Sequence, residues 1–297
     1  MKIKTASIVT ARTSSRRLPN KTVMKIKDDL RSIDIVIERA KKIGFPVILA
    51  TSTDSSDDVL AEIANQHQIE VFRGSLLNKI KRWYDCFNEY EIDSACIIEA
   101  DDIAFDYELY QSAMIKLDKS NSDLIMYPED IVTGLFLLNI KNIAIKKLFS
   151  LVPDEKINTD VVITKLLEKT DVNVSYLDVE SYAKNKKLRL TLDYPEDLDF
   201  FKELFKNIDI LSSGKTIIDF CLKNKSIMKI NFHKHKDYLE NQKKIGGKKE
   251  GKYIIHLTQP ENKRKKCLYS EPNINNAIET VVNYINLPFI NVKCFKC

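Results

Sequence analysis

Short apolar runs alternate with longer amphipathic stretches along the first part of the chain. Four runs have the length and composition of buried parallel strands, at residues 6–10, 47–50, 70–72 and 95–99. Apolar residues with helical spacing lie between and after these runs, at residues 33–42, 57–66, 77–90 and 107–117. This alternation predicts an α/β fold with a doubly wound, mostly parallel sheet.

The rhythm changes after residue 124, although the alternation continues. We expect strands of a mixed part of the sheet at residues 124–127, 134–139, 174–179 and 188–192, and helices at residues 142–149, 160–168 and 195–205. Pro195 with Glu196 and Asp197 suits the first turn of the last helix. Ligands of such sheets bind at the carboxyl ends of the strands, so we expect the chemistry after residues 10 and 99.

Charge divides the chain into two parts. The formal net charge is +5 over 297 residues, but residues 231–266 alone hold eleven Lys or Arg against four Asp or Glu. We therefore expect an α/β domain over residues 1–230 and a small, basic C-terminal extension over residues 231–297. The extension is predicted to contain a linker or exposed surface at 233–252, a strand at 253–257 and a helix at 274–285.

Composition also bears on location and partners. No apolar run reaches the ~20 residues that span a bilayer, and Arg12 interrupts the first run too early for a secretory signal. The six cysteines form no dense framework, so we expect a cytoplasmic protein with reduced thiols. For the C-x-x-C pair Cys294 and Cys297, ordinary thiols are favoured over a zinc site.

The role of the basic extension stays open. Its run of Lys and Arg at residues 263–266 favours a solvated surface over a nucleic-acid contact. A dimer contact and a docking surface for another enzyme are the remaining alternatives.

A basic, hydroxyl-rich loop follows the first predicted strand. Residues 11–21, which we call the basic loop, read ARTSSRRLPNK and contain no glycine, so they form neither a Walker A motif nor a dinucleotide fingerprint. Arg and Lys side chains neutralise phosphate oxygens, and backbone N–H groups complete such sites. The loop therefore predicts a polyphosphate ligand, with a solvated basic loop as the alternative.

Acidic residues follow two other predicted strands. Asp101, with Glu99 and Asp102 beside it, comes directly after the run at 96–98, and Asp193 comes directly after the run at 188–192. Core packing does not explain carboxylates at these positions, whereas a turn or a helix cap does. Hard carboxylate oxygens at strand ends also suit a divalent cation such as Mg2+.

Three motifs in order resemble those of one enzyme family over roughly the first 205 residues. The basic loop resembles the A-R-x-G-S-x-R-L-P-x-K loop of sugar-activating cytidylyltransferases, with Ser14 in place of the glycine. Residues 71–75 (VFRGS), followed by 82–84 (RWY), and residues 188–198 (LRLTLDYPEDL) resemble segments of SpsF-like cytidylyltransferases. These belong with the acylneuraminate cytidylyltransferases and are relatives of the CMP-Kdo synthetases.

The resemblance implies a nucleotide-diphospho-sugar transferase-like, Rossmann-like fold and transfer of CMP from CTP to an acidic or unusual sugar. Pyrophosphate would be released, Mg2+ would be the cofactor, the product would serve surface glycan assembly, and the enzyme would be a homodimer. The implied residues are Arg12, Lys21 and Asp101 for catalysis; Ala11, Arg12, Ser15, Arg17, Lys21, Thr51 and Arg73 for the nucleotide; Arg73, Arg82 and Arg189 for an acidic acceptor; and Asp101 and Asp193 for the metal.

The chain departs from the family pattern around Asp101. Residues 97–104 read IIEADDIA where relatives read R-x-T-G-D-x-P-L, and Asn78 and Lys81 stand where acids are usual. These departures leave two alternatives to CMP transfer. One is the same fold with another nucleotide, such as GTP, or with a phosphorylated or phosphonate acceptor. The other is a catalytically degenerate nucleotide-binding or scaffold protein.

Overall fold

A computed structural model describes residues 3–160, 163–185, 187–245, 251–258, 264–271 and 291–296. The chain forms two compact units, Met1–His235 and Lys236–Cys297. The basic loop and the acidic residues singled out above all belong to the first unit.

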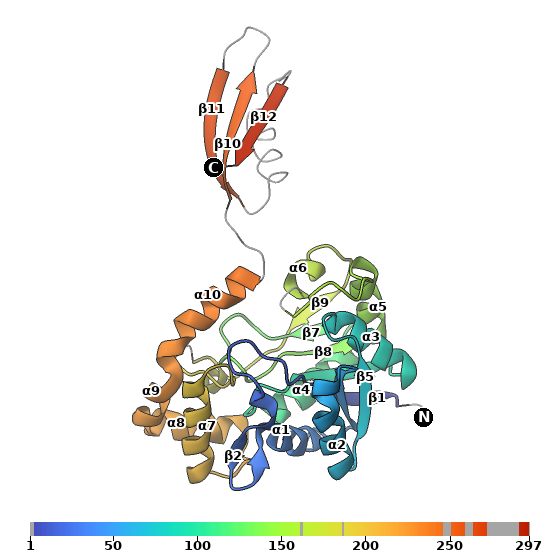
Figure 1. The fold of residues 1–297 in the computed structure, drawn as a ribbon, viewed down its shortest axis with the longest axis vertical. Helices are drawn as coiled ribbons and strands as arrows, with labels where there is room; N and C mark the ends of the chain where they lie inside the picture. The colour runs from blue at the N-terminus through green and yellow to red at the C-terminus, as the bar shows by residue number, and fades with distance from the viewer. Residues whose placement is uncertain are drawn as a thin grey trace. The chain divides into compact units, whose positions relative to one another are not determined.

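A seven-stranded sheet forms the centre of the first unit (Figure 1). Its strand order is β5 (Glu70–Gly74), β4 (Val47–Ser52), β1 (Thr5–Thr10), β6 (Ser94–Glu99), β8 (Leu138–Lys141), β7 (Leu124–Met126) and β9 (Val174–Tyr176). Neighbouring strands are parallel except that β8 runs antiparallel to both β6 and β7. The predicted mostly parallel, mixed sheet is confirmed.

Helices cover both faces of the sheet because successive strand residues alternate between two apolar cores. Val9 and Ile98 face the first core, with α1 (Ser32–Lys41), α2 (Asp58–Gln66), α4 (Tyr107–Lys119), α7 (Pro195–Asn207) and α8 (Gly214–Lys223). Ile8 and Ile97 face the second core, with α3 (Lys79–Glu89), α5 (Asn142–Leu151) and α6 (Ile163–Leu167). The sheet is therefore doubly wound, as predicted.

Two predicted strands differ from the structure. The strand expected at 134–139 begins only at Leu138, because Gly134 has a φ of 86° and its backbone lies directly against residue 190. A Cβ atom on Gly134 would be 2.3 Å from Leu190 O. The segment 188–192 is not a strand of the sheet: it makes one bridge, from Thr133 to Arg189. Its alternating leucines are nevertheless buried, which explains the strand-like pattern.

The chain after residue 207 contains more helix than its polarity indicated. Helix α9 (Lys225–Asn231) follows α8, and α10 (His235–Ile245) occupies part of the predicted linker, because residues 235–245 are good helix formers without glycine or proline. In the second unit, β10 (Gly251–Thr258) pairs antiparallel with β11 (Arg264–Glu271) and β12 (Asn291–Lys296). The strand predicted at 253–257 lies in β10, whereas the helix predicted at 274–285 and Cys297 lie outside the described residues.

Short elements complete the described chain. A hairpin of β2 (Lys25–Lys27) and β3 (Leu30–Arg31) leads into α1, and four short 3-10 helices are η1 (Lys21–Val23), η2 (Ser55–Asp57), η3 (Ser181–Ala183) and η4 (Phe232–Lys234). No helix among the described residues has the length and apolar character needed to cross a membrane.

Candidate active site

The basic loop leaves the end of β1 and is anchored to the neighbouring strand and helix. Ala11 N donates to Ala50 O at 3.2 Å. The buried carboxylate of Asp57 accepts hydrogen bonds from Thr13 N at 2.7 Å and Thr13 Oγ1 at 2.8 Å. Within the loop, Leu18 N donates to Ser15 Oγ at 3.4 Å. The loop is therefore held at the carboxyl end of the sheet, where the predicted ligand would bind.

The far end of the basic loop meets both predicted metal carboxylates. Lys21 Nζ lies 2.6 Å from Asp101 Oδ2 and 2.9 Å from Asp193 Oδ1. Burial alone would lower the pKa of Lys21, but the two carboxylates more than compensate and raise it above its ordinary value. Residues from three distant segments thus form one cluster around a charged ammonium group. We call Asp101 and Asp193 the carboxylate pair.

Asp193 is nearly inaccessible and contacts three cationic side chains. Oδ1 accepts from Arg17 Nη2 and from Lys21 Nζ, while Oδ2 accepts from Arg189 Nη2 at 3.1 Å. Although burial would raise the pKa of Asp193, Lys21 and Arg17 hold it well below its ordinary value. Asp193 is therefore ionised at neutral pH.

Asp197, rather than Asp193, caps the first turn of α7. Asp197 Oδ2 accepts from Asp193 N at 2.8 Å and Tyr194 N at 2.9 Å. Asp197 also binds Arg189 Nε at 3.0 Å, and Asn231 Nδ2 donates to Arg189 O at 3.1 Å and Asp197 Oδ1 at 2.9 Å. The capping alternative for Asp193 is thereby excluded, and its side chain faces the basic loop. Arg189, fully buried, contacts two carboxylates inside the protein.

Arg12 points to the other side of the cluster, toward the start of α3. Its guanidinium donates to Leu76 O and, at 2.6 Å, to Asp160 Oδ2. Lys79 Nζ donates to Asp160 O at 3.0 Å and pairs with Glu99 Oε1 at 2.6 Å. Glu99, one of the departures from the family pattern, therefore has a cationic partner.

The segment that carries Asp160 is held by one buried asparagine. Asn78 Nδ2 donates to Val152 O at 2.7 Å and Asp154 O at 2.9 Å, and Asn78 Oδ1 accepts from Thr159 Oγ1 at 3.1 Å. The same oxygen accepts from Lys81 N and so caps α3. Asn78, another departure from the family pattern, thus fixes residues 152–160, which we call the covering segment, against the start of α3.

Arg82 is buried beside Arg12 and forms no salt bridge with a carboxylate of the described residues. Its side chain is about 1% exposed, and Nη1 donates to Ser75 O at 2.9 Å. Among the residues that the structure describes, no hydrogen-bond partner lies within reach of its Nε atom. Burial, and then repulsion from Arg12, lower the pKa of Arg82 to about 10, which still leaves it charged at neutral pH. A buried cation of this kind suits an anionic ligand.

The two other residues that were predicted to bind the nucleotide lie on β4 and β5. Arg73 donates from Nε to Ser52 O at 2.9 Å and pairs with Asp58 Oδ1 at 2.7 Å, so it fastens the two strand ends together. Thr51 is fully buried on β4, opposite Arg73 in the register. In the described part of the chain, neither residue hydrogen-bonds to Lys21, Asp101 or Asp193.

Asp102 is the third acid at the end of β6. Burial, and then the neighbouring carboxylates of Asp101 and Glu99, raise its pKa well above the ordinary value. Thr191, two residues before Asp193, opposes part of this rise in the pKa of Asp102. Leu192 N also donates to Asp101 O at 2.8 Å, so the two acidic segments are tied together by the backbone.

The donor chemistry of the carboxylate pair fits Mg2+. Oxygens of Asp101 and Asp193 converge on one position that already holds a cationic nitrogen, and hard carboxylate oxygens are the ligands that Mg2+ prefers. Within the described part of the chain, no set of three or more His, Cys, Asp or Glu residues forms a closed metal site. A cation here would therefore need further oxygens from a ligand or from water.

Three residues of the candidate site were not predicted from the sequence to belong to it. Asp57, Lys79 and Asp160 lie in stretches that were predicted only to be helical, at residues 57–66, 77–90 and 160–168. Lys79 could have been found, because a lysine near the family motif complements the extra Glu99. Nothing local in the sequence marks Asp160, since its partner Arg12 lies 148 residues away.

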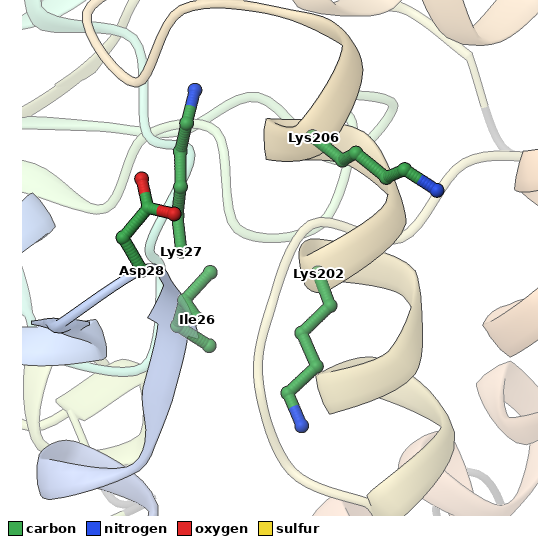
Figure 2. Close-up of a pocket in the computed structure, with 5 residues that line it drawn as sticks. All are labelled: Ile26, Lys27, Asp28, Lys202 and Lys206. Atoms are coloured by element: carbon green, nitrogen blue, oxygen red, sulfur yellow. The ribbon is translucent and has the colours of Figure 1, made fainter.

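A separate pocket lies between β2 and the second half of α7 and is lined by Ile26, Lys27, Asp28, Lys202 and Lys206 (Figure 2). Figure 2 shows Lys202 and Lys206 projecting from α7 in different directions. The pocket contains none of the residues that the sequence analysis assigned to the site.

Comparison with known proteins matches a cytidylyltransferase family model to residues 6–245. Uncharacterized protein MJ1063 of Methanocaldococcus jannaschii is 31% identical over 243 residues, covering 80% of this chain and 99% of that protein. A cytidylyltransferase structure from Leptospira borgpetersenii has a TM-score of 0.68 at 22% identity and covers 76% of this chain and 97% of that one.

A more distant fold neighbour is a CMP:2-keto-3-deoxy-manno-octonic acid synthetase solved with CTP. It has a TM-score of 0.53 at 14% identity, with 69% of this chain and 99% of that chain covered. The two solved structures share the fold, whereas the family model spans most of the chain. The chain belongs to the cytidylyltransferase family, the CTP-dependent nucleotidyltransferases.

Proposed function

We propose that this protein transfers CMP from CTP to an acidic or otherwise unusual sugar and releases pyrophosphate. An acceptor hydroxyl oxygen bonds to the α-phosphorus, the bond from that phosphorus to the pyrophosphate oxygen breaks, and the hydroxyl proton passes to solvent. Such transfer needs positioning and charge stabilisation more than covalent help from the protein. The observation that carries the proposal is the convergence of Asp101 and Asp193 on Lys21 at the end of the basic loop.

The basic loop supplies the cations for the triphosphate. Arg12 lies near the start of the loop, Arg17 within it and Lys21 at its end, and Asp57 holds the loop backbone in place. Ala11 and Ser15 lie in the same loop and would contribute through the loop backbone and a hydroxyl group. Thr51 and Arg73, on the adjacent strand ends, are assigned to the nucleoside side of the site.

The carboxylate pair would hold Mg2+, which when bound supplies charge stabilisation for the triphosphate and orients its oxygens. Arg189 holds Asp193 by a hydrogen bond to its carboxylate, and Asp197 holds it by accepting a hydrogen bond from its backbone N–H. Because Arg189 is already engaged by two carboxylates, we assign it to positioning rather than to the acceptor.

Arg82 is the favoured anchor for an anionic group of the acceptor. It is buried and charged, and it lies beside Arg12. A sugar carboxylate and a sugar phosphate share this chemistry, so both belong in the substrate panel. The pair of Lys79 and Glu99 at the departure from the family pattern favours, as a second candidate, an altered nucleotide or acceptor. Surface glycan assembly, a homodimer and a cytoplasmic location complete the proposal.

Pyrophosphate release from CTP, GTP, ATP and UTP should be measured with Mg2+ and a panel of acidic, phosphorylated and phosphonate sugars. Release with CTP and one acidic sugar is the expected result, and release with GTP alone would identify the second candidate. Asp101→Asn and Asp193→Asn should each lower turnover by roughly 100-fold or more, because charge at the metal position is lost.

A matched control removes an acid of the same type from the surface. Asp219 pairs with Lys215 on the exposed side of α8, so Asp219→Asn should keep the wild-type rate. Wild-type rates in both site variants would refute the assignment. Nucleotide binding without pyrophosphate release from any pair of substrates would instead identify a catalytically degenerate binding protein.

A further inference from the structure

Lys21 lies at the position that the proposed reaction reserves for a metal ion. Its ammonium is within 3 Å of one oxygen of each member of the carboxylate pair, and its side chain is 11% exposed. The backbone there is also fixed, because Ser32 Oγ donates to Lys21 O at 2.7 Å. In this arrangement, the ammonium is the counter-ion of the carboxylate pair.

The local charge is already balanced by the protein itself. Arg17 and Arg189 also contact Asp193, and Arg189 also pairs with Asp197, so three cationic groups face three carboxylates. A divalent ion that sought the same oxygens would meet these like charges at ion-pair distance, in a partly buried region where they are weakly screened. Free Mg2+ is therefore at a disadvantage as long as the ammonium of Lys21 stays in place.

A triphosphate removes that disadvantage. It offers anionic oxygens to the ammonium and to the arginines of the basic loop, and it provides the further oxygens that Mg2+ requires beyond two carboxylates. The side chain of Lys21 is flexible and unbranched, so its Nζ atom can change partners while Ser32 still holds the backbone of Lys21.

This role rests on the proposed function: we propose that Lys21 is an internal counter-ion, which neutralises the carboxylate pair until Mg2+ and a nucleoside triphosphate bind together. On binding, its ammonium exchanges the carboxylates for phosphate oxygens, and charge is conserved on both sides of the exchange. Divalent-ion binding and nucleotide binding are then positively coupled, and each is weak without the other.

The test measures Mn2+ binding in the absence of nucleotide, with the concentration of free Mn2+ determined by electron paramagnetic resonance. Wild type should bind no stoichiometric Mn2+. Lys21→Met should gain one Mn2+ site, with an affinity about tenfold or more above the weak binding by wild type. This factor is within the usual range of coupling between sites. Adding Asp193→Asn to Lys21→Met should abolish the new site. Lys21→Arg keeps the positive charge and should, like wild type, bind no stoichiometric Mn2+ in the absence of nucleotide.

Either of two results would overturn the counter-ion role. One is tight binding of Mn2+ by wild type without nucleotide, and the other is no gain of binding in Lys21→Met. Lys21→Gln serves as a second variant, because a polar amide can hydrogen-bond the carboxylates if the methionine variant does not fold.

These outcomes are separate from those of the turnover assay. Pyrophosphate release by a wild type that also binds Mn2+ without nucleotide would refute the counter-ion role and leave the proposed function intact. Coupled Mn2+ binding without pyrophosphate release from any substrate pair would refute the proposed function instead.

Discussion

The carboxylate of Asp160 forms an ion pair with the guanidinium of Arg12. In the proposed reaction, the same guanidinium binds phosphate oxygens of the nucleotide. Nucleotide binding then requires this partly exposed ion pair to open. Asp160→Asn should therefore tighten CTP binding, because the amide competes less well than the carboxylate for Arg12. We expect a roughly twofold to fivefold lower Kd for CTP, measured by isothermal titration calorimetry, because a partly exposed ion pair contributes up to about 1 kcal/mol.

Glu155 offers a matched control on the same covering segment. It pairs with Lys81 at 3.1 Å and makes no contact with Arg12, so Glu155→Gln removes an equal charge elsewhere. Its Kd for CTP should stay close to that of wild type. Weaker CTP binding by Asp160→Asn would show that the carboxylate assists the nucleotide rather than competing with it.

The types of residue in the site were more predictable than their partners. Arg12, Lys21, Asp101 and Asp193 could be singled out because each follows an apolar run near a sheet edge, and the structure brings the last three into direct contact. The pairing of Arg12 with Asp160 could not be predicted, because it depends on how a segment 148 residues away folds back over α3.

At the scale of single elements, the start of α1 depends on a buried acid. Asp34 Oδ2 accepts from Arg31 N at 2.7 Å and Arg31 Nε at 2.8 Å, and Asp34 Oδ1 contacts His67 Nε2 at 2.8 Å. Burial alone would raise the pKa of Asp34, but the hydrogen bonds from Arg31 and His67 lower it below its ordinary value of 3.8. The folded state therefore favours the ionised form.

Asp34→Asn should lower the free energy of unfolding by about 2 kcal/mol at pH 7, as the loss of charged hydrogen bonds to a buried group does. The sign follows from the lowered pKa: the stabilisation is present above pH 3.8 and is lost as the pH falls through the folded-state pKa. Urea unfolding at a series of pH values should show the gap between variant and wild type closing in acid.

The exposed pair of Lys25 and Asp29 provides the comparison for this series. Its carboxylate is almost fully exposed, so Asp29→Asn should produce no measurable change at any pH. A gap between Asp34→Asn and wild type that stays constant down to pH 3 would contradict the assigned ionisation.

Strands could be predicted from the sequence where the buried apolar residues also form the hydrogen-bond ladders of the sheet. The central strands β1, β4 and β6 have apolar residues on both faces and full ladders, so their apolar runs marked them correctly. The prediction of a strand at 188–192 was wrong, because its leucines are buried without a ladder. Periodicity records burial, and it does not record which backbone groups are paired.

At the scale of the first unit, one arginine connects three segments. Arg39 on α1 is fully buried and donates from Nε to Phe105 O at 3.0 Å, and from Nη1 to Ile210 O at 2.7 Å and Ser212 O at 2.9 Å. Burial lowers the pKa of Arg39 to about 10, so the group is still charged at neutral pH. It joins the loop that follows β6 and the proposed metal ligand Asp101 to the chain after α7.

Arg39→Met should lower the free energy of unfolding by about 3 kcal/mol, since several buried carbonyl groups lose a charged donor. Urea unfolding at pH 7 would measure the change. Lys41→Met on the same helix removes only an exposed pair with Glu38 and should change stability by less than about 0.5 kcal/mol. Equal effects of the two substitutions would show that Arg39 is not a connecting residue.

The contact of Asn231 with Arg189 and Asp197 has a consequence for folding of the chain during translation. A growing chain exposes its N-terminal strands first, and domains generally fold as units once their last element is available. Asp193 acquires its final surroundings only when α9 has been made and has packed, although every proposed site residue was translated well before. The proposed active site is thus completed near the end of the translation of the first unit, and the nascent chain carries unassembled acidic and basic segments until then.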